Sequence, residues 1–229
     1  MNAVVIRETF RRHVTHAGYI SVLVLIAILG IVSAQSIRPA TFWPGLVTLL
    51  AVVTGCGIIG PEFSSGTLQL ILVKPVNRSS YLLSRVTGVL LVIWLAALTG
   101  CAAETLARLF NKSLVLESMG IGLVNVMAET LLIVSLLTLL GSITRAYFNV
   151  AIFYGLQIAL AVGAAVLRMS REVPAFVLEA LAAIDRNLFP DVPPLPNPGL
   201  LLLLLSNAAV ALLLACLAFN QREVPYGAD

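Results

Sequence analysis

The chain has 229 residues, of which 59% are hydrophobic and only 11% charged, and its formal net charge is +3. Soluble domains carry about 25% charged residues, and a soluble protein of this size cannot hide so much apolar surface. The composition therefore excludes an ordinary soluble enzyme, a disordered chain and a nucleic-acid-binding protein, and it indicates an all-α integral membrane protein.

The first segment, residues 1–18, has the pattern of an amphipathic helix. Apolar residues recur there at spacings of three and four, namely Ala3, Ile6, Phe10, Val14 and Ala17. Another face carries Glu8, Arg11, Arg12 and Thr15, which makes the polar side basic. The expected interface residues are Arg7, Arg11 and Arg12. This pattern is typical of a helix that lies in the membrane interface. The alternative is that the segment extends the first span into water.

Six apolar stretches follow, each close to the roughly 20 residues that a helix needs to cross the hydrocarbon layer. We expect spans near Tyr19–Ser36, Trp43–Gly60, Val86–Ala107, Met119–Ile143, Phe148–Leu167 and Gly199–Phe219. Together they form one transmembrane domain over residues 1–229. A signal peptide is a competing interpretation of the first stretch, because Val32-Ser33-Ala34 resembles a cleavage site.

With six spans, both ends of the chain lie on one side of the membrane, and the positive-inside rule favours a cytoplasmic side for them. Three arginines precede the first span and one follows it. The cytoplasmic segments would hold eight basic residues: Arg7, Arg11, Arg12, Lys74, Arg78, Arg85, Arg145 and Arg222. The outer segments would hold six: Arg38, Arg108, Lys112, Arg168, Arg171 and Arg186. The expected location is a bacterial cytoplasmic membrane.

The longest outer segment, residues 168–198, predicts a short surface helix followed by a stiff connection. Pro174 fits the first turn of a helix, and apolar residues from Val173 to Leu188 share one face. Five prolines between Pro190 and Pro198 then exclude a continuing helix.

Common catalytic motifs are missing from the sequence. It contains no HExxH, no GxSxG and no Gly-Lys pair of a P-loop. The three cysteines, Cys56, Cys101 and Cys216, lie in apolar runs and are expected to be packing residues. We therefore expect no catalytic site, no metal and no cofactor in this chain, and no ATP hydrolysis by the P-loop route.

Two acids fall within the expected spans. Glu129 is near the middle of the fourth span, where an acid costs about 2.5–3.5 kcal/mol, and Glu104 is near the outer end of the third, where it could reach the headgroups. Asn125 is one turn before Glu129 and could share its hydrogen bond. These three residues are candidates either for a solute path or for a lock between helices; a neutral packing role for Glu129 is equally open.

A row of small residues, Ala151, Gly155, Ala159 and Gly163, recurs every four residues in the fifth span. Small residues let another helix backbone approach closely. The partner is either a second subunit or another helix of this chain.

The loop of residues 61–85, between the second and third spans, is unusually apolar for a cytoplasmic segment. Leu68, Leu70, Ile71 and Leu72 need either the bilayer surface or a protein groove to cover them. Asn77 is placed to cap a new helix that runs through Arg78 into the third span.

The order of residues in this loop resembles that of the ABC-2 (type-2) permeases of ABC transporters. The matching residues are Glu62, Gly66-Thr67-Leu68, Leu72, Pro75-Val76, Arg78 and Arg85. The interface helix, the six spans and the outer segment extend the resemblance over essentially the whole chain, although this outer segment is shorter and richer in proline than in some relatives.

The resemblance implies the permease subunit of an ATP-driven exporter. The loop would then form a coupling helix on a separate ATPase subunit, which is present in two copies and binds ATP and Mg. The contact residues carried over are Glu62, Ser65, Gly66, Thr67, Leu68, Leu70, Lys74, Pro75 and Arg78. Such permeases pair with a second copy or a homologous permease, and the second and fifth spans line the path. Two other functions stay open: an ion-coupled carrier that uses Glu129, and a non-transporting membrane scaffold or assembly factor.

Overall fold

The computed structural model describes residues 2–35, 42–59, 77–111, 116–144, 148–169, 175–188 and 198–221, and every regular element in these ranges is an α-helix. The predicted all-α class is thus confirmed for the described part. The helices are α1 (Ala3–Val14), α2 (Ala17–Ser33), α3 (Trp43–Cys56), α6 (Arg78–Phe110), α7 (Leu116–Ile143), α8 (Phe148–Met169), α9 (Ala175–Leu188) and α10 (Pro198–Gln221). Each expected span and each amphipathic segment overlaps one of them, and a helix starts at Arg78 as expected. Six membrane-spanning helices are not confirmed, and the expected coupling helix lies outside the described residues.

Three helices, α6, α7 and α10, are long and apolar enough to cross a membrane. The pair α1 and α2 also meets this condition, but it is bent by 72°. In contrast, α3 has 14 residues and the apolar stretch Phe148–Gly163 of α8 is also short, against the roughly 20 residues of a perpendicular span. By length and composition the described helices therefore give three spans, or four with the bent pair, and indicate an integral membrane protein.

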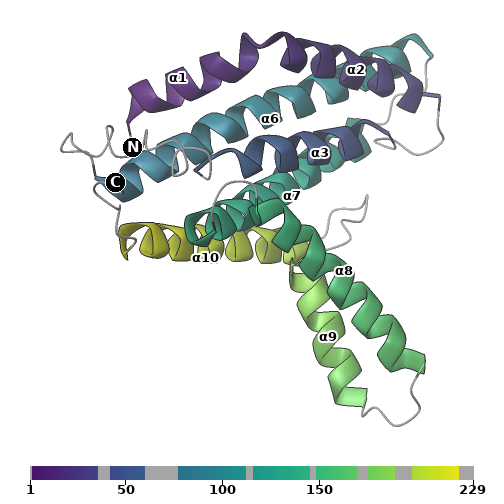
Figure 1. Ribbon diagram of the computed structural model, residues 1–229. Helices are drawn as coiled ribbons and strands as arrows, with labels where there is room; N and C mark the ends of the chain where they lie inside the picture. The colour runs from purple at the N-terminus through teal and green to yellow at the C-terminus, as the bar shows by residue number, and fades with distance from the viewer. Residues whose placement is uncertain are drawn as a thin grey trace.

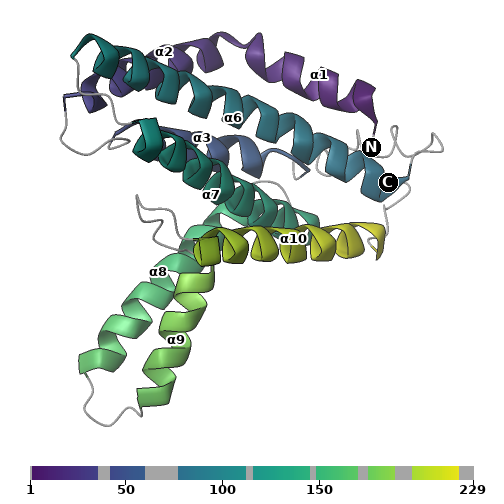
Figure 2. The same ribbon diagram turned by 180° about the vertical axis from the view of Figure 1, so that it is seen from behind.

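The longest helix, α6, is the centre of the bundle. Its 33 residues correspond to a rod of about 50 Å. As predicted, Asn77 caps its start, because the Asn77 side chain accepts a hydrogen bond from the Ser79 backbone N–H. Figure 1 shows α1 and α2 along one side of α6 and α3 and α7 along the other, with α10 against α7. Both views show α8 and α9 leaving this bundle as a projecting hairpin (Figures 1 and 2).

Glycines let α2 and α3 approach α6 closely. A Cβ on Gly100 would lie 2.8 Å from the Trp43 ring and 2.9 Å from Ile26, and a Cβ on Gly30 would lie 2.6 Å from the Gly100 carbonyl oxygen. Real side chains do not tolerate such distances, so these contacts depend on bare backbone. They hold α2, α3 and α6 together at one end of the bundle.

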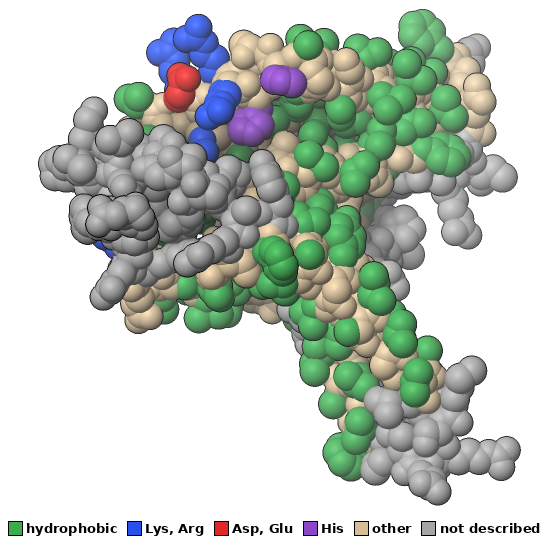
Figure 3. All heavy atoms as spheres, in the orientation of Figure 1, with side chains coloured by type: hydrophobic (Ala, Val, Ile, Leu, Met, Phe, Trp, Pro, Cys, Tyr) green, Lys and Arg blue, Asp and Glu red, His purple; other side chains and the backbone are tan. Residues whose placement is uncertain are grey.

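The outer surface of the helices is as apolar as their core. Side chains such as Val24, Ile28, Leu49, Val53 and Leu213 are half exposed or more, and hydrophobic side chains spread over much of the described surface in Figure 3. So much exposed apolar surface is unfavourable in water and is expected where helices face lipid. The apolar surface, like the helix lengths, therefore indicates an integral membrane protein.

We predict that Gly100→Ala destabilises the bundle. The added methyl group would press on Trp43 and Ile26, and overpacking costs about 1–3 kcal/mol, more than the roughly 0.5–1 kcal/mol that alanine gains over glycine in a helix. The measurement is thermal unfolding of the purified protein in detergent. Gly45→Ala in α3 is the matched control, since a Cβ there meets open space; equal melting temperatures for the two variants would contradict the close packing at Gly100.

Candidate functional site

A buried polar cluster joins three helices at one end of the bundle. The Glu104 carboxylate accepts from Trp43 Nε1 at 2.8 Å and from Arg108 Nε at 3.0 Å. Arg108 also donates from a terminal guanidinium nitrogen to the Ser33 carbonyl oxygen at 3.0 Å. Glu104 and Trp43 are 1% exposed and Arg108 is 4% exposed. Both oxygens of the buried carboxylate therefore have donors, and its charge is neutralised by an adjacent cation.

The local sequence explains how these groups meet. Glu104 and Arg108 are four residues apart in α6, so they share one face and form an ion pair. Ser33 is the last residue of α2, where backbone carbonyls lack helical partners and a cation is favourable. Trp43 is the first residue of α3. The cluster thus ties the end of α2, the start of α3 and the last turns of α6 together.

This geometry corrects two expectations. Arg108 was expected in an outer segment as one of the charges that set topology, but it lies in α6 and is buried against Glu104. Glu104 could have reached the headgroups, but its oxygens accept from Trp43 of α3 and from Arg108 of its own helix instead. Without Arg108, the expected cytoplasmic segments hold eight basic residues and the expected outer segments hold five.

The other candidate acid, Glu129, lies on α7 and faces α3. Its Oε1 accepts from Thr48 Oγ1 at 3.4 Å, a long hydrogen bond between two half-buried side chains. Asn125, also half-buried, lies one turn before it. Glu104 and Glu129 therefore both contact α3, but at positions five residues apart, about 7.5 Å along the helix axis. The structure does not bring these acids into one site.

Most of the expected ATPase-contact residues lie outside the described residues. These are Glu62, Ser65, Gly66, Thr67, Leu68, Leu70, Lys74 and Pro75. Of this set Arg78 is described: it starts α6 and donates to the Asn220 carbonyl oxygen at 3.5 Å. The Asn220 side chain in turn donates to Ser79 Oγ at 2.8 Å. These bonds join the beginning of α6 to the end of α10.

The start of α1 and the end of α10 lie at this same end of the bundle (Figure 1). Near the N-terminus, the Asn2 backbone N–H donates to Ser84 Oγ at 2.7 Å. The flanks of loop 60–76, which are the end of α3 and the start of α6, also lie there. The loop therefore connects to the bundle on the side that carries the start of α1 and the end of α10.

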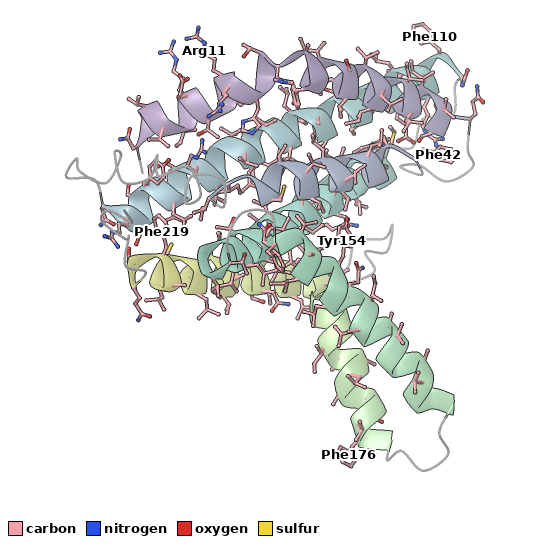
Figure 4. The ribbon with its side chains drawn as sticks, in the orientation of Figure 1. Arg11, Phe42, Phe110, Tyr154, Phe176 and Phe219 are labelled. Atoms are coloured by element: carbon pink, nitrogen blue, oxygen red, sulfur yellow. The ribbon has the colours of Figure 1, made fainter. Side chains whose placement is uncertain are left out.

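The small-residue row on α8 is uncovered within the described part of the chain. Ala151, Gly155 and Ala159 are exposed and Gly163 is half exposed, and a Cβ on either glycine would meet open space. Among the helices that the structure describes, none covers this row. Figure 4 shows Tyr154 near the base of the projecting hairpin and Phe176 at its far tip.

The base of α8 is fixed to the bundle by Asn149, which sequence reasoning missed. Its Nδ2 lies 3.3 Å from the carbonyl oxygens of Cys56 and Leu137, so it bonds to both α3 and α7. A lone asparagine after a hairpin turn carries no local signal of this role. For Arg108, by contrast, the four-residue spacing from Glu104 was available as a signal.

The basic residues of α1, Arg7, Arg11 and Arg12, are exposed, and Arg11 points away from the bundle in Figure 4. Between them and α6, the side chain of Thr9 is buried beside Gly88. The helix is therefore amphipathic in the fold as well as in the sequence. Within the described ranges, no three His, Cys, Asp or Glu side chains gather as a metal site would require.

We predict that the single variant Arg108→Met lowers the free energy of unfolding more than the double variant that carries both Glu104→Gln and Arg108→Met. The single variant leaves a buried carboxylate without its cation, a loss of about 3–5 kcal/mol, whereas the double variant removes both charges and keeps an amide oxygen for Trp43. The measurement is unfolding in detergent, with expression level as a second readout. Arg11→Met, at an exposed cation, is the control; a double variant no more stable than the single one would show that packing, not uncompensated charge, sets the cost.

Comparison with known proteins adds no family to these observations. No protein-family model matches the chain, and no curated protein matches it. The proposals below therefore rest on the sequence and the fold.

Proposed function

We propose that the chain is the membrane-spanning permease subunit of an ABC exporter of the ABC-2 type. The observation that carries the proposal is the order of residues in loop 61–85. This loop resembles the corresponding ABC-2 loop, and its flanks, the end of α3 and the start of α6, lie toward the end of the bundle that holds the start of α1 and the end of α10. In the proposed orientation this end is cytoplasmic, where an ATPase subunit would reach it.

The proposed topology has six spans: α2, α3, α6, α7, α8 and α10. In this topology α1 lies in the interface and α9 on the outer side. The short α3 corresponds to about 21 Å of helix, so it would need locally thinned lipid or the cover of α6 and α7, against which it packs.

The proposed mechanism divides the work between two subunits. ATP and Mg bind to the partner ATPase, whose two copies close on ATP binding. The loop passes this movement to α6, which contacts α1, α2, α3, α7 and α10. A displaced α6 would therefore change the packing of most of the bundle, as a switch between inward- and outward-facing states requires.

A second permease chain completes the proposal. The exposed row from Ala151 to Gly163 on α8 would let another helix backbone approach closely, and packing of this kind drives association in lipid. The apolar surface of α8, with Leu156, Ile158, Val162 and Val166 exposed, would also be covered in such a pair.

An ion-coupled carrier is the second candidate, favoured by Glu129. An acid on a membrane helix that bonds across to Thr48 of another helix has the setting of a proton-relay group. This function needs no ATPase. It requires uptake that depends on a proton gradient and is lost in Glu129→Gln, whereas the exporter proposal requires transport that depends on ATP.

We predict that Leu70→Glu, or deletion of residues 64–74, disrupts binding of the ATPase. A charge in the apolar face of the loop would not fit a hydrophobic groove, because burying an unpaired carboxylate is unfavourable. The measurement is copurification of the P-loop ATPase with the tagged chain, together with the response of its ATP hydrolysis to the permease.

Thr15→Glu is the control for this experiment, since it places the same charge in the exposed turn between α1 and α2. Leu70→Glu and Thr15→Glu should both have the melting temperature of the wild type. If the ATPase still copurifies with Leu70→Glu and still responds to the permease, the loop is not its docking site.

We also predict that Gly155→Leu weakens self-association of the chain. A leucine in the small-residue row would hold the second helix away, with an expected loss of about 1–3 kcal/mol, which corresponds to roughly 5- to 150-fold in the dissociation constant. The measurement is the dimer fraction in nanodiscs by mass photometry. Gly120→Leu on α7 is the matched control, because a side chain there also meets open space. A monomeric wild type, or equal loss in both variants, would contradict pairing through α8.

A further inference from the structure

A cavity of about 510 Å³ lies between α1 and the wall formed by α6 and α7. Its lining from α1 is Ala3, Ile6, Arg7 and Phe10, and its lining from α6 and α7 is Leu91, Trp94, Leu95, Leu98 and Met127. This volume falls within the ~300–1,000 Å³ of small-molecule sites. The loop, the α8 row and the buried polar cluster described above contribute no residue to it.

The cavity is apolar except at one edge. Leu91, Leu95 and Leu98 on α6 are 36–48% exposed, and α6 is one of the three helices that meet the length and hydropathy of a span. The charged residue of the lining is Arg7, on the helix face that also carries Arg11 (Figure 3 shows the Lys and Arg side chains gathered over α1). The cavity thus combines a hydrocarbon-like wall with a cation at its edge.

Trp94 adds a polar feature to this wall. Its indole Nε1 is buried, and no described residue accepts its proton. A buried donor without an acceptor is uncommon and unfavourable. An ester or phosphate oxygen seated beside the ring would supply the missing acceptor after a small side-chain rotation.

We propose that this cavity holds one anionic phospholipid of the surrounding bilayer, with an acyl chain against α6 and the phosphate at Arg7. The apolar wall selects hydrocarbon, and the cation selects an anionic headgroup, because a guanidinium pairs with phosphate oxygens in a bidentate manner. The lipid would fill the space between α1 and α6 and so hold the amphipathic helix against the bundle. This proposal rests on the membrane character of the chain and not on the transport function.

The two tryptophans of the chain allow a direct test. Trp94 lines the cavity, whereas Trp43 is 1% exposed and bound to Glu104. The protein is reconstituted in phosphatidylcholine vesicles that contain the same small fraction of either brominated phosphatidylglycerol or brominated phosphatidylcholine. Bromine quenches indole fluorescence on contact, so a selective site gives stronger quenching by the anionic lipid. Trp94→Phe should remove this excess.

The matched variants are Arg7→Gln and Arg12→Gln, which remove the same charge from the same helix. We expect Arg7→Gln to lower the preference for the anionic lipid about fivefold, the effect of roughly 1 kcal/mol per cation near the surface, and Arg12→Gln to leave it within twofold of wild type. Equal quenching by both lipids in the wild type would overturn the proposal. Equal effects of the two variants would also overturn it, because they would show a general surface attraction instead of a site.

Discussion

The buried ion pair of Glu104 and Arg108 is the constraint on which the rest of the bundle depends. Removing a carboxylate and a guanidinium from water costs several kcal/mol each unless every polar atom finds a partner. Here the carboxylate oxygens accept from Arg108 and Trp43, and Arg108 also reaches the Ser33 carbonyl oxygen. These partners come from α2, α3 and α6, so the ends of three helices must meet in one place. The close approach at Gly100 provides the space in which they do so.

This clamp and Asn149 together fix both ends of α3 and the base of α8. Trp43 holds the start of α3, and Asn149 bonds to the carbonyl of Cys56 at its end. Because Asn149 is the second residue of α8, the base of α8 is fixed while the remainder projects with exposed apolar side chains (Figure 2). The chain therefore combines a closed bundle with a hairpin whose surface lacks cover in the described part.

Local patterns sufficed to predict the helices but not their contacts. Apolar length predicted where α6, α7 and α10 lie, and Asn77 identified a helix start to the residue, because these signals involve neighbours in the chain. The bond of Trp43 to Glu104 joins residues 61 apart, and no spacing rule specifies such a pair. Arg108 is different, because its four-residue spacing from Glu104 was a local signal of the ion pair, and only its bond to Ser33 on another helix had none. The loop that indicates the function, from Glu62 to Pro75, lies outside the described residues, so its role rests on sequence alone.

The two ends of α6 are held with unequal strength, and this has a mechanical consequence for the proposed transporter. At the far end, Glu104 and Arg108 are buried and charge-assisted, which makes their hydrogen bonds strong and hard to exchange with water. At the loop end, Arg78 and Ser79 bind Asn220 through exposed hydrogen bonds, which contribute little net stability because water competes for them. A force applied through the loop would therefore break contacts at the start of α6 first. Since the helix is a rigid rod clamped at its other end, it would pivot about the polar cluster instead of sliding. The largest displacement would then fall at the loop end of α6, where it meets the start of α1 and the end of α10.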